Sequence, residues 1–185
     1  MYILGQFFGI LGAIITVITP QLRKKEQMLL SNALVNTMST LNFFLIGQKG
    51  SAVFLCLVAI AQCFVSMHHE KKHTDVTLGE NILFFFLYVG FGLFGMVTSE
   101  NFVWALTANF FLELLPIVGA LMLMLSVFAK GEQKTRLYLL FNAATWAVYS
   151  AIVGATTFFT GCAALISTLF ALRKYQKAQS CGNAN

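Results

Sequence analysis

Polar side chains recur at helical spacing in two stretches that are otherwise apolar. Asn36 and Thr40 lie four residues apart in the first stretch, and Asn142, Trp146 and Tyr149 share one helical face in the second. An unpaired amide is costly in hydrocarbon, so both faces are expected to point into a helix bundle. Amides and hydroxyls bind the polar groups of a small neutral or zwitterionic solute, while aromatic rings cover its apolar face. The alternative is that Asn36 and Asn142 only join neighbouring helices.

Three more residues are candidates for the same pocket. Gln62 and Ser167 are polar positions within apolar stretches, although each could equally have a structural role. Glu113 is the only acid inside an apolar segment, and an ionisable group within a membrane is a candidate for proton coupling. In the alternative interpretation Glu113 lies in the first turn of its helix, where the helix dipole and water stabilise the carboxylate.

The residue patterns typical of metal sites, cofactor sites and enzyme active sites are largely missing from the sequence. His68, His69 and His73 lie near Glu70 and Asp75, but their spacing matches no zinc pattern, which favours a solvated loop. The chain has no glycine-rich phosphate loop and no nucleophile elbow. With a single acid inside the apolar segments, it lacks the positioned base or metal that hydrolysis or group transfer needs. We therefore predict no metal, no cofactor and no enzymatic activity.

The elements that carry these residues are membrane helices. Of the 185 residues, 58% are hydrophobic and 10% charged, and the mean hydropathy is +0.76, which a soluble domain does not sustain. Charged clusters divide the chain into apolar stretches that supply seven crossings at about 20 residues each. They predict helices near residues 2–20, 27–47, 51–68, 81–98, 111–129, 134–153 and 156–172.

The basic residues orient these helices. Of the 12 Lys and Arg residues, only Lys49 falls on the side of the N-terminus when seven crossings are drawn. The positive-inside bias therefore predicts an external N-terminus and a cytoplasmic C-terminus in a multi-pass plasma-membrane protein. In that setting the net charge of +5 favours contact with lipid headgroups over nucleic acid.

The chain also repeats itself. At an offset of 107 residues, the segment 6–13 aligns with 113–120, and 45–47 aligns with 152–154. A directly fused three-helix unit would be inverted, and the helix near 81–98 restores the orientation. The predicted fold is all-α, with two parallel three-helix bundles joined by a linker helix. Residues 1–72 form the first bundle, 73–110 the linker helix and outer loop, 111–174 the second bundle, and 175–185 a cytoplasmic tail. Gly90, Gly92 and Gly95 allow the linker helix to pack closely, within the protomer or against a second copy.

Three short patterns carry a resemblance: residues 113–119, Trp146 eight residues before Gly154, and residues 42–47 after Lys24 and Lys25. In these patterns the chain resembles the YgjV-type bacterial inner-membrane proteins. This resemblance implies a SWEET-like or PQ-loop-like fold in the bacterial inner membrane. Pro20 and Gln21 form a short Pro-Gln pair, but the paired asparagines with which SWEETs bind sugar are absent from the third and seventh helices. Sugar is therefore not the expected substrate.

We predict a small-solute transporter that works by alternating access between the two repeats. The proposed pocket places Asn36, Thr40 and Gln62 opposite a second set of polar residues, with proton coupling through Glu113 as an option. The second set consists of Asn142, Trp146, Tyr149 and Ser167. The alternative is a structural or regulatory membrane subunit without transport activity.

Overall fold

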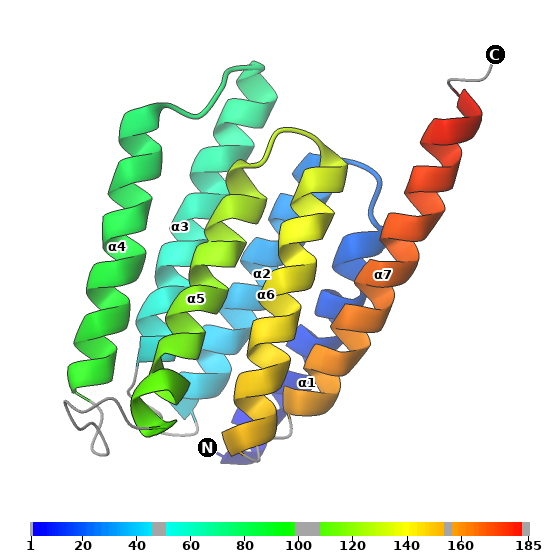
Figure 1. Ribbon diagram of the computed structural model, residues 1–185. Helices are drawn as coiled ribbons and strands as arrows, with labels where there is room; N and C mark the ends of the chain where they lie inside the picture. Colours follow the sequence, from blue (N-terminus) through cyan, green and yellow to red (C-terminus); the bar gives the residue numbers. More distant parts are fainter. Residues whose placement is uncertain (1, 46–50, 99–107, 154–156, 183–185) are drawn as a thin grey trace.

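The computed structural model describes residues 2–45, 51–98, 108–153 and 157–182, which are helical with short connections and contain no strand (Figure 1). The helices are α1 (Tyr2–Ile18), η1 (Thr19–Gln21), α2 (Lys25–Leu45), α3 (Ser51–Lys72), α4 (Leu78–Val97), α5 (Ala108–Phe128), α6 (Glu132–Val153) and α7 (Thr157–Gly182). The prediction of an all-helical chain is confirmed. The segment 175–182, expected as a tail, continues α7 as helix, and α5 already begins at Ala108.

Three of the helices are long and apolar enough to cross a membrane, judged over the described residues. The spans are Ile3–Gln21, Val53–Lys72 and Leu78–Val97, and Leu114–Phe128 of α5 is a shorter apolar helix. The helices α2 and α6 are not among them, because asparagines, threonines and other polar residues recur along both. Their lower hydropathy is typical of helices that keep a polar face inside a bundle.

Six helices form a closed ring. α1, α2 and α3 contact one another in succession, as do α5, α6 and α7, and the contacts of α3 with α5 and of α1 with α7 complete the ring. In Figure 1, α5, α6 and α7 pass in front of α3, α2 and α1. α4 lies outside the ring and packs on both α3 and α5. Gly92 of α4 permits this close packing, because a Cβ there would lie 2.7 Å from Cγ1 of Ile117.

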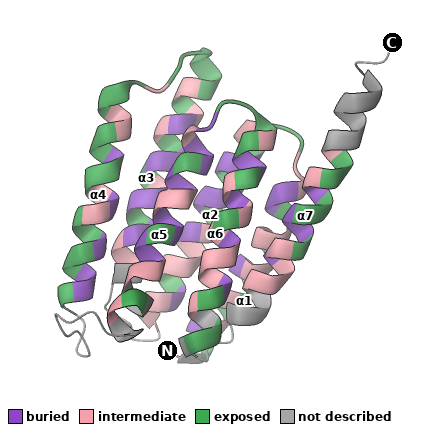
Figure 2. Cartoon of the chain, in the orientation of Figure 1, coloured by how far each residue is buried: buried purple, intermediate pink, exposed green. Residues whose placement is uncertain are grey.

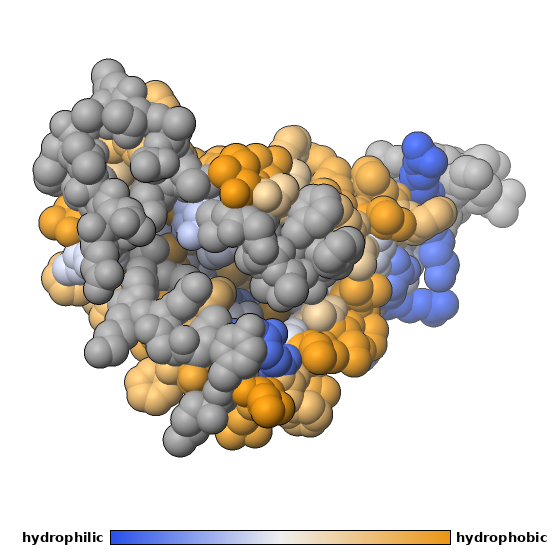
Figure 3. Space-filling view, turned by 90° about the horizontal axis from the view of Figure 1, so that it is seen from below, coloured by the Kyte–Doolittle hydropathy of each residue, from blue (hydrophilic) through white to orange (hydrophobic). Residues whose placement is uncertain are grey.

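The apolar core occupies the middle of the molecule and extends toward one of its ends, as the purple segments in Figure 2 show. The connections 22–24, 73–77 and 129–131 lie together at that end, which we call the basic end because Arg23, Lys24 and Lys130 belong to it (Figure 1). The main core residues on α2, α5 and α6 are Met28, Leu29, Ala33, Leu123, Val127 and Leu139. Viewed along the helices, apolar side chains form much of the outline of the described part of the bundle, as a bilayer requires (Figure 3).

The first helix ends in a break that exposes backbone carbonyls. Pro20 lacks an N–H and cannot continue the α-helical hydrogen bonds, so the chain tightens into η1. The N–H of Leu22 then donates to the carbonyl of Thr19 at 3.2 Å. Carbonyls at a helix C-terminus need donors from elsewhere when they are buried.

Candidate functional site

A buried arginine supplies donors to the broken end of the first helix. Arg136, in the first turns of α6, is only 2% exposed. Its Nε donates to the carbonyl of Pro20 at 3.1 Å, and an Nη donates to the carbonyl of Leu22 at 2.8 Å. The guanidinium also lies 4.1 Å from the ring centre of Tyr175 in α7. One side chain therefore joins the ends of α1, α6 and α7 at the basic end.

Side chains of α7 complete this network. The Tyr175 hydroxyl donates to the Gln21 carbonyl at 2.9 Å, and the Ser167 hydroxyl donates to the Val17 carbonyl at 2.6 Å. The Gln21 side-chain amide donates to Ser167 at 2.8 Å for the carbonyl and 3.0 Å for the hydroxyl. We call Gln21, Arg136, Ser167 and Tyr175 the basic-end network. It holds α1 against α6 and α7 through the carbonyls at the end of the first helix.

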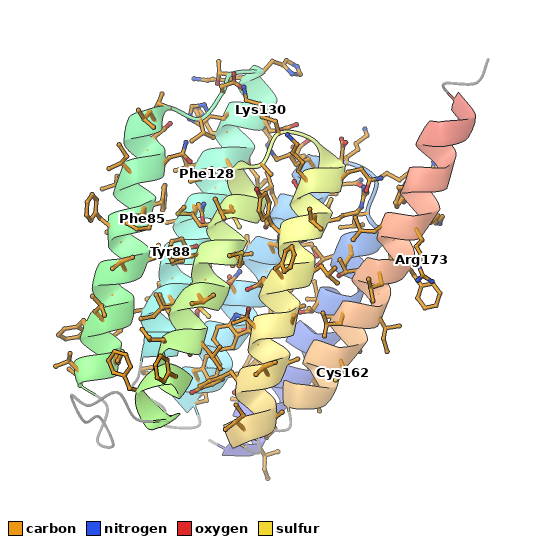
Figure 4. All side chains as sticks on the ribbon, in the orientation of Figure 1. Phe85, Tyr88, Phe128, Lys130, Cys162 and Arg173 are labelled. Carbon is orange, nitrogen blue, oxygen red and sulfur yellow. The ribbon has the colours of Figure 1, made fainter. Side chains whose placement is uncertain are left out.

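The contact between α3 and α5 has hydrogen bonds of the same kind. Gln62 donates to the carbonyl of Met124 at 3.1 Å, and Ser66 donates to the carbonyl of Val127 at 3.0 Å. The Tyr88 hydroxyl of α4 donates to Oε1 of Gln62 at 2.7 Å. Tyr88 lies on the side of α4 that faces α3 (Figure 4). Three helices are thus tied together by the Gln62 amide, which is fully buried.

The polar stripes of α2 and α6 belong to helices at opposite positions of the ring. Asn36 is buried, and its amide donates to the Asn32 carbonyl of its own helix at 2.8 Å. Thr40 donates to the Asn36 carbonyl at 2.8 Å. On α6, the ring of Trp146 meets that of Tyr149 edge to face, with centroids 5.8 Å apart.

Asn142 differs from the other predicted site residues. Its Oδ1 is buried and accepts no hydrogen bond from the described part of the chain. Asn142 lies three residues beyond the core residue Leu139 along α6, away from the basic end. A buried carbonyl oxygen without a donor calls for a water molecule or a ligand.

The structure distributes the predicted site residues over three places. Asn36 and Thr40 lie on α2, and Asn142, Trp146 and Tyr149 on α6, as expected from their spacing. Gln62 lies in the contact of α3 with α5, and Ser167 in the contact of α1 with α7, where each already has hydrogen-bond partners. The side chain of Glu113 lies outside the described residues. Ligand binding by these residues remains a prediction.

A polar pocket of about 420 Å³ at the basic end is lined by charged residues that are mostly paired. Lys130 binds Asp75 at 2.7 Å, and this hydrogen bond and charge lower the pKa of the Asp75 carboxyl. His69 binds Glu80 at 2.9 Å and Thr74 at 2.9 Å. Among the described residues no group of three or more His, Cys, Asp or Glu is arranged to hold a metal.

Nearly the whole length of this helical bundle matches a protein family. The Imp-YgjV family model, described as bacterial inner membrane protein, matches residues 3–179. The chain belongs to this family. The match confirms the resemblance to YgjV-type proteins and identifies an inner-membrane protein. It does not extend to SWEET or PQ-loop transporters. Comparison with curated proteins found no match, and comparison with solved structures found none.

In this member of the Imp-YgjV family, sequence reasoning missed three of the residues that hold the helices together. In the sequence, Arg136 is one of the 12 basic residues that orient the helices, and Tyr175 begins the segment 175–185 that is expected to be a tail. Tyr88 was not singled out from the aromatic residues of its helix. The sequence contains one indication of this network. Pro20 predicts a helix end, where carbonyls lack donors from their own helix, and a basic residue early in another helix could supply those donors.

Proposed function

We propose that this inner-membrane protein is a small-solute transporter that works by alternating access. In this proposal seven helices cross the membrane in a SWEET-like arrangement of three helices, the linker α4, and three helices. The N-terminus faces out, and the basic end faces the cytoplasm, as the distribution of Lys and Arg favours. The solute is small and neutral or zwitterionic.

Acceptor carbonyls at matching positions of the two halves support the repeat. Ser167 of α7 donates to Val17 of α1, and Gln62 of α3 donates to Met124 of α5. The two acceptors lie 107 residues apart, which is the offset of the sequence repeat. The same offset separates two further acceptor carbonyls, Pro20, which binds Arg136, and Val127, which binds Ser66. Ser167 of α7 and Gln62 and Ser66 of α3 thus donate from the third helix of one unit to the first helix of the other, whereas Pro20 is bound from α6, the second helix of its unit.

The proposal rests on what surrounds the polar stripes of α2 and α6. An apolar core closes them on the side of the basic end, and polar groups begin one helical turn further away. Toward the basic end, Leu29 and Ala33 of α2 and Leu139 of α6 belong to one apolar core, and the basic-end network lies beyond it. One helical turn away from that core come Asn36 and the unpartnered oxygen of Asn142. Polar groups next to a sealed end are the arrangement expected of a transporter closed on one side.

Transport would require the contact of α3 with α5 and the contact of α1 with α7 to rearrange in turn. The hydrogen bonds of Gln62 and of Ser167 connect helices of different halves, so rocking of the halves would strain these bonds first. In the proposed binding site Asn36 and Thr40 face Asn142, with the rings of Trp146 and Tyr149 beside the solute. Movement is either downhill or coupled to protons through Glu113.

Thermal-shift screening of the purified protein against metabolites, followed by uptake into proteoliposomes, tests this proposal. For a solute identified in this way, we expect the double substitution Asn36→Ala and Asn142→Ala to abolish uptake and weaken binding. Thr145→Ala is the matched control, because the Thr145 hydroxyl bonds only the Phe141 carbonyl of its own helix among the described residues. Unchanged uptake in a folded double variant would exclude this binding site.

The role of Glu113 has its own test. If the carboxylate carries a proton, Glu113→Gln should remove the dependence of uptake on pH while leaving the fold intact. Uptake by Glu113→Gln with an unaltered pH profile would restrict Glu113 to a structural role.

The alternative function is a structural or regulatory membrane subunit. It is favoured by the internal hydrogen bonds of Asn36, Gln62 and Ser167, which satisfy these side chains without any solute. A subunit of this kind would bind no metabolite and would move none, but would co-purify with a defined membrane partner.

A further inference from the structure

The two contacts that close the helix ring are covered differently. α4 packs across the contact between α3 and α5. At the contact between α1 and α7, a groove of about 620 Å³ opens instead. Its lining residues are Val17, Ile18, Gln21, Ala163, Ile166, Ser167 and Phe170.

The groove has apolar walls that face outward. Ile18 is 50% exposed, Ile166 56% and Phe170 66%. Since α1 is one of the apolar candidate spans of an inner-membrane protein, hydrocarbon rather than water surrounds these walls. Gln21 and Ser167 form the polar part of the groove, and each is already hydrogen-bonded. The groove therefore suits an extended apolar chain.

Basic residues continue the groove toward the basic end. Arg173 follows Phe170 by three residues and Ile166 by seven, so it lies on the same face of α7, with Lys174 beside it. Arg173 projects from the outer side of α7 (Figure 4). On the α1 side, Arg23 and Lys24 follow η1 and are exposed.

Within the described residues, the four cations near the groove lack acidic partners. They are Arg23, Lys24, Arg173 and Lys174. Lysines near α3 and α5, on the other side of the ring, do have such partners. There, Lys25 binds Glu70 at 3.5 Å, and Lys130 binds Asp75 at 2.7 Å. Lys174 contacts the ring of Tyr175, and neither it nor the other three enters an ion pair. An apolar groove that ends among unpaired cations complements a lipid with an anionic headgroup.

We propose that the groove between α1 and α7 binds one anionic phospholipid. An acyl chain lies along Ile18, Ile166 and Phe170, and the headgroup phosphate binds Arg173 and Lys174. The lipid covers the contact of α1 with α7 in the way that α4 covers the contact of α3 with α5. It also touches Gln21 and Ser167, so its binding stabilises the basic-end network.

A second copy of the chain fits this site less well than a lipid does. The chain has seven Asp and Glu residues, and four of them already form ion pairs on the other side of the ring. The three that remain are too few to pair with all four cations.

Mass spectrometry of the intact detergent-solubilised protein tests the proposal. Phosphatidylglycerol or phosphatidylcholine is added, and the fraction of protein that keeps one lipid is measured. We expect one phosphatidylglycerol to be retained in preference to phosphatidylcholine. The double substitution Arg173→Gln and Lys174→Gln should weaken retention roughly thirtyfold, because each cation near a headgroup contributes a factor of about five. Ala163→Phe, which fills the groove, should remove the bound lipid altogether.

The matched control is Lys71→Gln with Lys72→Gln, which removes the same charge at the end of α3. It should keep the lipid, and the thermal unfolding midpoint of each variant verifies its fold. Equal retention of the two lipids, or unchanged retention in the Arg173 and Lys174 variant, would overturn the proposal in favour of unspecific lipid contact. A dimer that Ala163→Phe disrupts would overturn it in favour of a second copy. Since the measurement involves no transport, its failure is separate from failure of the proposed function.

Discussion

At the scale of single residues, Arg136 combines deep burial with a positive charge. Moving a guanidinium out of water is costly unless its N–H groups find acceptors. Here the acceptors are the carbonyls of Pro20 and Leu22 rather than a carboxylate. They lie at the C-terminal end of the first helix, where the helix dipole is negative and favours a cation. The break at Pro20 therefore creates the site that the charge of Arg136 requires.

Replacing Arg136 should weaken the whole basic end. We expect Arg136→Ala to lower the free energy of unfolding by about 3 kcal/mol, since two charge-assisted hydrogen bonds are lost and the carbonyls stay buried. Arg136→Lys should recover only part of this loss, because an ammonium cannot reproduce the planar fork. Denaturant unfolding in detergent measures both. Lys134→Ala, an exposed neighbour, is the control, and equal stability of the Arg136→Ala and Lys134→Ala proteins would refute this role.

A substitution at Gly119 of α5 tests how Trp146 of α6 packs against it. A Cβ at Gly119 would lie 2.9 Å from Nε1 of Trp146, so Gly119→Ala should displace the ring and lower the free energy of unfolding by about 1 to 2 kcal/mol. Gly90→Ala is the matched control in α4, since a Cβ there meets nothing within 4 Å and should be neutral or slightly stabilising. In a Trp104→Phe background, the emission of Trp146 should shift in the first variant only. The same emission from both variants would show that α5 and α6 do not pack as described.

At the scale of elements, the N-terminus of α4 is fixed by a reciprocal cap between Thr77 and Glu80. Thr77 accepts from the N–H of Glu80 at 3.3 Å, and the Glu80 carboxylate accepts from the N–H of Thr77 at 2.7 Å. This reciprocal cap satisfies two N–H groups that the helix leaves free. The same carboxylate group binds His69 of α3, so the cap also fixes where α4 begins beside its neighbour.

Loss of this cap should loosen the first turn of α4. We expect Thr77→Ala to cost about 1 kcal/mol and to speed hydrogen exchange of the amides near residues 78–81. Thr98→Ala at the other end of α4 removes a hydroxyl that bonds only carbonyls of its own helix, and serves as the control. If exchange near 78–81 stays the same in Thr77→Ala, the cap contributes nothing.

At the scale of the whole molecule, the connections 22–24, 73–77 and 129–131 share one end of the bundle (Figure 1). Single cysteines that replace Arg23, Asp75 or Lys130 in a background without native cysteines should therefore label from the same side of the membrane. The positive-inside bias places that side in the cytoplasm. A membrane-impermeant thiol reagent applied to intact cells and to inverted vesicles makes the measurement. Labelling of one of the three from the opposite face would contradict the seven-crossing proposal.

The amino-acid sequence alone establishes a helical membrane protein, because hydropathy and the spacing of charged residues act locally along the chain. It also located the polar stripes of α2 and α6, since side chains four residues apart share a face whatever lies opposite them. The inner-membrane family was likewise recognisable from the residues alone.

The hydrogen-bond partners of the polar side chains, by contrast, become known only from the folded molecule. Gln62 and Ser167 look alike in sequence as isolated polar residues, yet one joins α3, α4 and α5 while the other joins α7 to α1. The role of Arg136 likewise depends on a carbonyl 116 positions away in the chain. Hydrogen bonds between distant segments follow from how the helices pack, and neither helical periodicity nor hydropathy carries that information.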